Sequence, residues 1–180
     1  MPTLKFNDKN FIISMMAAVD IDELLLLTNI SSNNIVRTVP LPSCSRRSGP
    51  ILLYPNNEKA IKILEIIGRP FPCNNENDMK PLISMTGHIS SFYELMRVSQ
   101  DWFINEGISD KIARQYVSSF YLSLAESALS SNDTLSELVE EAATPGGINE
   151  QTMKFLKSTN HFNDQSTSLT SILNRLRGKK

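Results

Sequence analysis

Apolar positions in the first 73 residues form short runs that predict strands separated by helices. Three runs have the length and the β-branched content of strands, at residues 11–17, 35–39 and 51–54. The first run is nearly continuous in apolar side chains, which predicts a strand buried on both faces. The second alternates apolar and polar side chains, and Pro40 ends it because proline lacks the backbone donor that a central strand uses. This part of the chain therefore has an α/β pattern.

Helix signals lie between these runs. Asp20 and Glu23 have the spacing of a capping box, with Asp in place of Ser or Thr, and they precede an apolar run at residues 24–27. Asn57 can cap a second helix, and Gly68 follows its last apolar position, as a stop signal requires. Strand and helix signals therefore alternate up to residue 73.

After Glu76 the spacing of apolar residues is helical, and no convincing strand remains. Helices are predicted within residues 77–106, from Asp110, from Asp133 or Thr134, from residue 148 and over residues 166–176. In the helix from Asp110, apolar side chains recur at three- and four-residue steps and form one stripe, which belongs to the core or to an interface: Ala113, Val117, Phe120, Tyr121, Leu124 and Ala128. The polar segment 74–78 separates the two patterns, so we predict a first domain of residues 1–75 and a helical domain of residues 76–180.

The composition indicates a globular protein and argues against several function classes. The chain has 180 residues, 41% of them hydrophobic, which is enough for a core. Its formal net charge of -1 and the lack of a long basic run argue against nucleic-acid binding, because phosphate recognition needs concentrated Lys and Arg. No apolar run approaches the ~20 residues that span a bilayer, and the first residues lack the pattern of a signal peptide. We therefore expect a cytoplasmic location and no membrane contact.

Cysteine and histidine are too sparse to predict a metal site. Cys44 and Cys73 form no CxxC pair and have no histidine nearby, so we expect no metal and no redox motif. His161 falls in a predicted polar connector without a partner at metal-ligand spacing, and we assign it no role.

Residues 144–151 form the segment that is hardest to explain by packing alone. Pro145 restricts one backbone angle, whereas Gly146 and Gly147 let another group approach the bare backbone. If a helix follows the glycines, its free N–H groups and the positive end of its dipole suit a carboxylate or a phosphate. The alternative is an ordinary helix start with Thr144 as N-cap and Pro145 in the first turn. The turn is the main candidate for binding a small anion.

Six short motifs follow one another along the chain. They are Ile13-Ser-Met-Met-Ala-Ala-Val19, Ile35-Val-Arg-Thr-Val-Pro40, Tyr54-Pro55, a helix ending at Ile67-Gly68, Thr86-Gly87 and Thr144-Pro-Gly-Gly147. This succession resembles the pyrroline-5-carboxylate reductase family, whose members reduce a small cyclic imine acid with NADPH or NADH in proline synthesis. The resemblance runs from about residue 10 to residue 160. It is greatest to a divergent branch that has Pro40-Leu-Pro42 and Gly147-Ile-Asn-Glu-Gln151.

The resemblance implies a partial Rossmann-like sheet in residues 1–75 and an all-α dimerisation domain in residues 76–180. In the family, a dinucleotide-binding domain precedes a helical domain that forms an intertwined homodimer, and the active site lies between domains and subunits. The cofactor is NADP or NAD, and the substrate is a small carboxylate. The chain is therefore expected to be an oxidoreductase-like homodimer.

The resemblance also assigns roles to residues of this sequence. Substrate contacts fall on Thr86, Gly87, Thr144, Pro145, Gly146, Gly147 and Ile148. Cofactor contacts fall on Ala17, Ala18, Pro40 and Leu41. His88 and Asn149 are the candidates for catalysis, because an imidazole can polarise a carboxylate or imine and an amide can donate a hydrogen bond to a ring nitrogen. A surface or helix-cap role is the alternative for both.

Arg37 lies in the second predicted strand, shortly before the proline turn. On the family's pattern it helps to fix the segment before that turn. An ion pair at the surface is the alternative explanation.

Several positions depart from the family's motifs. The usual Met-Pro-Asn-Thr-Pro appears as Val39-Pro-Leu-Pro-Ser43, so Leu41 replaces the asparagine expected to face the cofactor. The usual Ser-Gly-Ser-Gly-Pro-Ala-Tyr appears as Thr86-Gly-His-Ile-Ser-Ser-Phe92. The two threonines after the glycines have become Ile148 and Asn149. The identity of the substrate is therefore open.

The chain lacks the glycine-rich first turn of a dinucleotide-binding unit. Only a backbone without side chains can approach the pyrophosphate, and no two of the first five glycines lie within ten residues of each other: Gly49, Gly68, Gly87, Gly107 and Gly146. The first βαβ units are therefore expected to be absent, which would leave a sheet edge and an apolar face open. A second polypeptide could supply this half, the gene could be a degraded remnant, or the start site could be wrong. We predict that this chain alone binds NADP(H) weakly or not at all.

Two hypotheses of function follow. The first is a pyrroline-5-carboxylate reductase-like, NAD(P)H-dependent oxidoreductase that is inactive as this chain alone. The second is a non-catalytic dimerisation or interaction module that keeps the helical fold of that family.

Overall fold

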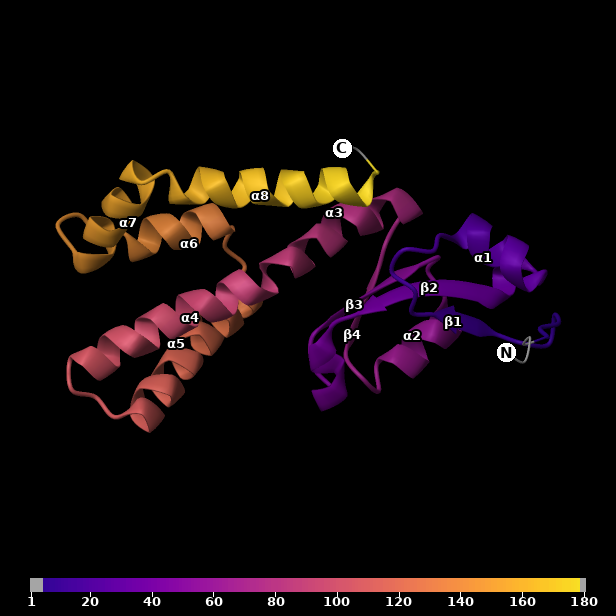
Figure 1. Cartoon of the computed structure of the whole chain (residues 1–180), viewed down its shortest axis with the longest axis horizontal. Coiled ribbons are helices and arrows are strands. Elements are labelled where there is room, and N and C mark those ends of the chain that lie inside the picture. The colour runs from indigo at the N-terminus through magenta and orange to yellow at the C-terminus, as the bar shows by residue number, and fades with distance from the viewer. Residues whose placement is uncertain (1–4, 179–180) are drawn as a thin grey trace. The chain divides into compact units, whose positions relative to one another are not determined.

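The computed structural model describes residues 5–178, which divide into two compact units (Figure 1). The first unit contains the chain up to Thr86 and the end of the last helix from Ile172. The second unit runs from Gly87 to Ser171. The first holds a small sheet and the second is helical, so the predicted α/β segment followed by an all-α region is confirmed.

The first unit is built on a four-stranded mixed sheet. Its strands are β1 (Ile12–Ser14), β2 (Ile35–Pro40), β3 (Pro50–Tyr54) and β4 (Arg69–Pro72), in that order across the sheet. β1 and β2 are parallel, β2 and β3 are antiparallel, and β3 and β4 are parallel. The strands predicted over residues 35–39 and 51–54 are therefore confirmed.

Helices cover both faces of this sheet. They are α1 (Ile21–Thr28), α2 (Glu58–Leu64) and α3 (Met79–Ser84). The connections between elements contain the 3-10 turns η1 (Ser32–Asn34), η2 (Pro42–Arg46), η3 (Glu76–Asp78) and η4 (Met85–His88). Side chains alternate between the faces of a strand. On one face, α2 packs against Val36, Ile51 and Leu53. On the other, α1 packs against Ile35, and α3 packs against Val39.

The N-caps predicted at Asp20 and Asn57 are confirmed, whereas α2 ends at Leu64, before the expected end at Ile67-Gly68. The Asp20 side chain accepts a hydrogen bond of 3.0 Å from the backbone N–H of Glu23, at the start of α1. The Asn57 side chain accepts one of 3.0 Å from the N–H of Ala60, at the start of α2. Each cap satisfies a backbone donor that the first helical turn leaves free.

Two strand predictions need correction. The first strand covers only residues 12–14, and Met15 and Met16 are 55% and 54% exposed instead of buried on both faces. β1 lies at an edge of the sheet, so the chain can leave the ladder early. β4 was not predicted, because Pro70 and Pro72 remove two backbone donors from its four residues, which only an edge strand tolerates.

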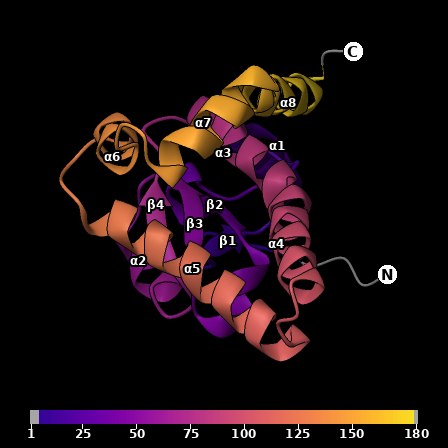
Figure 2. The ribbon, with the colours of Figure 1, turned by 90° about the vertical axis from the view of Figure 1, so that its left-hand side faces the viewer.

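The second unit consists of helices. They are α4 (Ile89–Asn105), α5 (Asp110–Ser130), α6 (Leu135–Ala142), α7 (Ile148–Ser158) and most of α8 (His161–Leu176). α4 and α5 contact each other and form a helical hairpin, and Figure 2 shows them diverging from the turn that joins them. Two ring contacts join the helices, between Phe92 and Tyr121 (5.5 Å between centroids) and between Phe103 and Tyr116 (5.7 Å).

The apolar stripe of α5 has two parts. Ala113 and Val117 are buried, whereas Phe120 and Leu124 are 47% and 51% exposed. The stripe therefore supplies core residues at its beginning and exposed apolar surface further along.

The predicted position of His161 needs correction. His161 begins α8 and does not lie in a connector.

Candidate functional site

The predicted cofactor residues lie at or after the carboxyl ends of β1 and β2. These strands are parallel, with Ser14 opposite Arg37, so their carboxyl ends point to the same edge of the sheet. The exposed Ala17 and Ala18 lie in the turn after β1, and Leu41 directly follows Pro40, the last residue of β2. Dinucleotides bind at such carboxyl edges in open α/β sheets.

Arg37 is buried within this region, with 2% of its surface exposed. Its Nη1 lies 2.7 Å from Oε1 of Glu76, and its Nη2 donates to the backbone carbonyl of Ala17. The alternative of a surface ion pair is therefore wrong. The pairing with Glu76 could not be predicted, because 39 residues separate the two positions and no local pattern links them.

The turn at residues 144–147 leads into α7. Gly146 has φ of +75°, in the left-handed region that glycine adopts without strain, and the N–H of Gly147 donates to the carbonyl of Thr144 (2.9 Å). The N-cap of α7 is Gly147, and the helix begins at Ile148. The alternative with Thr144 as N-cap and Pro145 in the first turn is therefore wrong, because the positive φ of Gly146 delays the helix.

A carboxylate of the chain itself already binds this turn. Oε2 of Glu150 accepts a hydrogen bond of 2.9 Å from the N–H of Gly146, and its Oε1 lies 2.9 Å from Nζ of Lys154. The contact with Lys154, followed by that with Gly146, lowers the pKa of Glu150. The Gly146 amide can therefore hold a carboxylate, and an external carboxylate would have to displace Glu150.

We expect the Gly146 amide to report this contact in an NMR titration. The folded pKa of Glu150 is lowered, so the contact contributes stability above the unfolded pKa and loses it as the pH falls through the folded pKa. The amide shift of Gly146 should follow a midpoint below the ordinary value of 4.5, and Lys154→Met should raise that midpoint. A midpoint at or above 4.5 would contradict the contact.

The two candidate catalytic residues bind other parts of the second unit. Nε2 of His88 lies 2.8 Å from Oγ of Ser168 in α8, and Nδ2 of Asn149 donates to the carbonyl of Ala142 at 3.1 Å. Within residues 87–171, no hydrogen bond joins the His88 side chain to the turn at 144–147. Both catalytic assignments stay predictions.

The predicted substrate residues are divided between the two units. Thr86 ends the long segment of the first unit and Gly87 begins the second, both within η4. Thr144, Pro145 and Gly146 are exposed, and Ile148 is 81% exposed. The turn is therefore accessible to a ligand.

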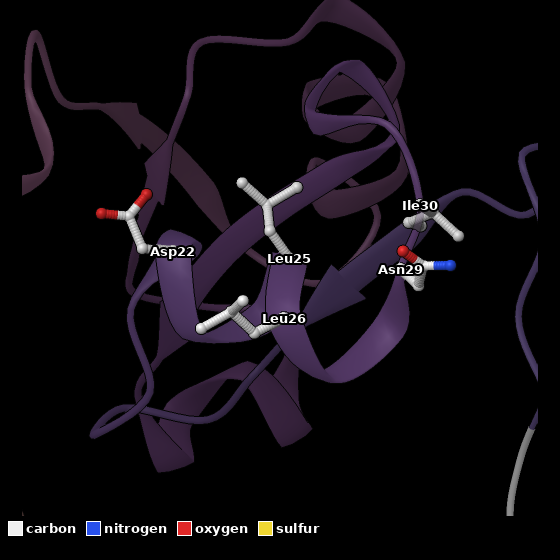
Figure 3. A pocket seen from close by; sticks show the side chains of 5 residues that line it. All are labelled: Asp22, Leu25, Leu26, Asn29 and Ile30. Carbon is white, nitrogen blue, oxygen red and sulfur yellow. The ribbon is translucent and has the colours of Figure 1, made fainter.

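One surface hollow lies at α1, and none of the residues that line it is a predicted site residue. Figure 3 shows the side chains that line it, which are Asp22, Leu25, Leu26, Asn29 and Ile30.

Among residues 5–178 no group of three His, Cys, Asp or Glu side chains could hold a metal ion. None of the helices within residues 5–178 is long and apolar enough to cross a membrane.

Comparison with known proteins relates the chain to one family. The family model described as pyrroline-5-carboxylate reductase dimerisation matches residues 76–174. No curated protein matches the chain.

Three solved structures share the fold. A pyrroline-5-carboxylate reductase from Coxiella burnetii has a TM-score of 0.79 and 22% identity, over 94% of this chain and 66% of that chain. Plasmodium falciparum pyrroline carboxylate reductase with NADP bound has a TM-score of 0.80 and 17% identity, over 94% and 70%. A 1-pyrroline-5-carboxylate reductase from Streptococcus pyogenes has a TM-score of 0.78 and 15% identity, over 92% and 66%. The chain thus spans about two thirds of the length of these structures.

Proposed function

Since the chain belongs to the pyrroline-5-carboxylate reductase family, we propose that it forms the dimerisation and substrate part of an NAD(P)H-dependent reductase of small cyclic imine acids. The match over residues 76–174 is the observation that carries the proposal. The proposed reaction moves a hydride from reduced nicotinamide to the C=N carbon of the substrate. It needs little acid/base chemistry, because orienting donor and acceptor in a dry pocket supplies much of the acceleration.

The turn at residues 144–147 supports a carboxylate substrate. Its Gly146 amide already holds the carboxylate of Glu150, and α7 presents its N-terminal end directly after Gly147. In the proposed complex the substrate carboxylate takes the place of Glu150. Thr86, Gly87 and Ile148 complete the proposed substrate contacts, and His88 and Asn149 stay the proposed catalytic residues.

The residues present do not fit a whole dinucleotide. The small exposed side chains of Ala17 and Ala18 follow β1, and we propose that they face the nicotinamide end of the cofactor. Pro40 and Leu41 complete the proposed cofactor contacts. The sequence has no glycine-rich turn for the pyrophosphate. We therefore propose that residues 1–180 by themselves bind NADP(H) weakly or not at all.

A homodimer is the proposed assembly. The exposed apolar side chains of α4 and α5, among them Trp102, Tyr116 and Phe120, offer a surface of the kind that mediates dimerisation.

The proposed domain boundary lies near residue 75, next to the start of the family match at residue 76. The cytoplasmic location stays a prediction.

The test compares the chain alone with a chimera. Light scattering, calorimetric titration with NADPH and an imine reduction assay are applied to the purified chain. We expect a dimer without saturable micromolar NADPH binding and without turnover. Joined to the first βαβ units of a family reductase, the chain should reduce pyrroline-5-carboxylate, and the same chimera with Gly146→Val should be impaired in substrate binding.

The alternative of a non-catalytic dimerisation module gives different results. A folded, dimeric chimera that binds NADPH but reduces no cyclic imine acid would favour the module. Saturable micromolar NADPH binding by the chain alone would contradict the proposed weakness of cofactor binding.

A further inference from the structure

Arg37 lies where the strand pattern expects an apolar side chain. Ile35 and Val39, two residues before and after it in β2, are buried in the clusters formed with α1 and with α3. By alternation along the strand, the guanidinium lies on the same face of the sheet, between these two clusters. Its side chain is 3% exposed, and that of Glu76 is 25% exposed.

This buried pair is poorly explained by stability alone. A buried ion pair repays the loss of hydration only with good geometry and full hydrogen bonding, and apolar residues of similar volume often stabilise a core as well. Nε of Arg37 is buried and has no hydrogen-bond partner among residues 5–178. The stability of the fold therefore does not by itself explain why a buried ion pair of Arg37 and Glu76 lies at this position.

The contacts of the pair converge on the segment between β1 and α1. Arg37 donates to the carbonyl of Ala17, 20 residues earlier in the chain. Oε1 of Glu76 also accepts a hydrogen bond of 3.0 Å from the N–H of Ile21, 55 residues earlier. Within the segment itself, the N–H of Val19 donates to the carbonyl of Met16 at 3.3 Å. Long-range contacts from Arg37 and Glu76 thus supplement a weak local bond.

We propose that Arg37 is a positioning residue whose guanidinium, oriented by Glu76, holds residues 15–21 in one conformation at the carboxyl end of β1. The inference rests on the proposed function only in taking Ala17 and Ala18 as cofactor contacts. A segment ordered before the ligand arrives loses less conformational freedom on binding. Arg37 would therefore act on the cofactor site through the backbone carbonyl of Ala17.

Hydrogen exchange of the Val19 amide tests this role, because neither Arg37 nor Glu76 contacts that amide. The full chain is compared with Arg37→Met and with Arg37→Met/Glu76→Leu, which replaces both charges by apolar side chains. Loss of the contacts that Arg37 makes with Ala17 and Glu76 should speed hydrogen exchange at Val19 about tenfold in both variants. Exchange at Leu53, in the centre of β3, should change less than about twofold in the double variant.

The double variant separates positioning from stability. Arg37→Met leaves the charge of Glu76 without its partner, whereas the double variant contains neither charge. We therefore expect the melting temperature of the double variant to be close to that of the parent chain. Its exchange at Val19 should stay fast. If exchange at Val19 is unchanged in the double variant, or rises together with that at Leu53, the proposal is overturned. Arg37→Lys keeps the charge without the planar fork and should give intermediate exchange at Val19 if Arg37→Met does not fold.

A matched control is available on α4. Arg97 forms ion pairs with Glu94 and Asp101, but its side chain is 56% exposed. Arg97→Met removes the same type of group and should leave exchange at Val19 unchanged, whereas faster exchange there would overturn the specific role of Arg37. A reductase assay that failed would count against the proposed function without altering these results.

Discussion

Phe120→Glu combined with Leu124→Glu is expected to dissociate the proposed dimer into monomers. Both side chains belong to the α5 stripe, and both are about half exposed. In the proposed dimer the partner covers them, so two glutamates would bring unpaired charges into an apolar contact. We expect the dissociation constant to rise by at least about 100-fold, since truncation of a buried anchor commonly costs about 2 kcal/mol or more. Sedimentation velocity over a range of concentrations measures the change.

The matched control for this pair is Gln115→Glu. Gln115 lies on the same helix, nearly opposite Leu124 at about 100° per residue, and is exposed. It adds a charge without touching the stripe, so the dimer should persist. A circular dichroism spectrum like that of the parent chain would show that α5 still folds around Ala113 and Val117. A double variant that stayed dimeric at low concentration would contradict the proposed interface.

Gly68→Ala should lower the free energy of unfolding of the first unit by about 1–3 kcal/mol. A Cβ at this position would lie 2.8 Å from the carbonyl oxygen of Gly49 and 2.9 Å from Cδ1 of Ile51. The carbonyl cannot yield easily, because it accepts a hydrogen bond of 2.9 Å from the N–H of Arg69 at the start of β4. The melting temperature of this unit should fall by about 4–8 °C for each kcal/mol.

Gly107→Ala provides the comparison. Gly107 has φ of +90°, but nothing lies within 4 Å of the Cβ that alanine would add. The substitution should cost only the conformational strain of about 1–2 kcal/mol, in the turn between α4 and α5. Exchange of β3 amides should therefore rise in Gly68→Ala and not in Gly107→Ala. The reverse order would mean that the contact between Gly68 and Gly49 does not limit the stability of the sheet.

Local signals predicted much of the fold. The caps at Asp20 and Asn57 need only a side-chain oxygen and a backbone N–H three residues later, so they can be read from sequence. The strands around residues 35–39 and 51–54 have apolar spacing and flanking prolines. β4 escaped prediction because its prolines oppose strand formation everywhere except at an edge, and its edge position depends on the whole sheet.

The candidate site was predictable in part. The turn at residues 144–147 was identified from Pro145 and the two glycines, and the position of the α7 start was anticipated by the glycines preceding Ile148. The carboxylate that binds the turn was not anticipated, although Glu150 lies only four residues after Gly146. Glutamate in the first turn of a helix is common, and only the rotamer and the φ of Gly146 bring it to that amide.

The sequence by itself determined most of the elements before β4, the change from an α/β to a helical pattern near residue 75 and the motifs that resemble one reductase family, because these depend on spacing and residue type over short distances. The tertiary structure alone decided that Arg37 is buried, that Glu76 pairs with it and that this pair reaches Ala17 and Ile21. Such contacts join residues 20 to 55 positions apart. They exist only once the sheet and its helices have brought distant segments together, so no local pattern encodes them.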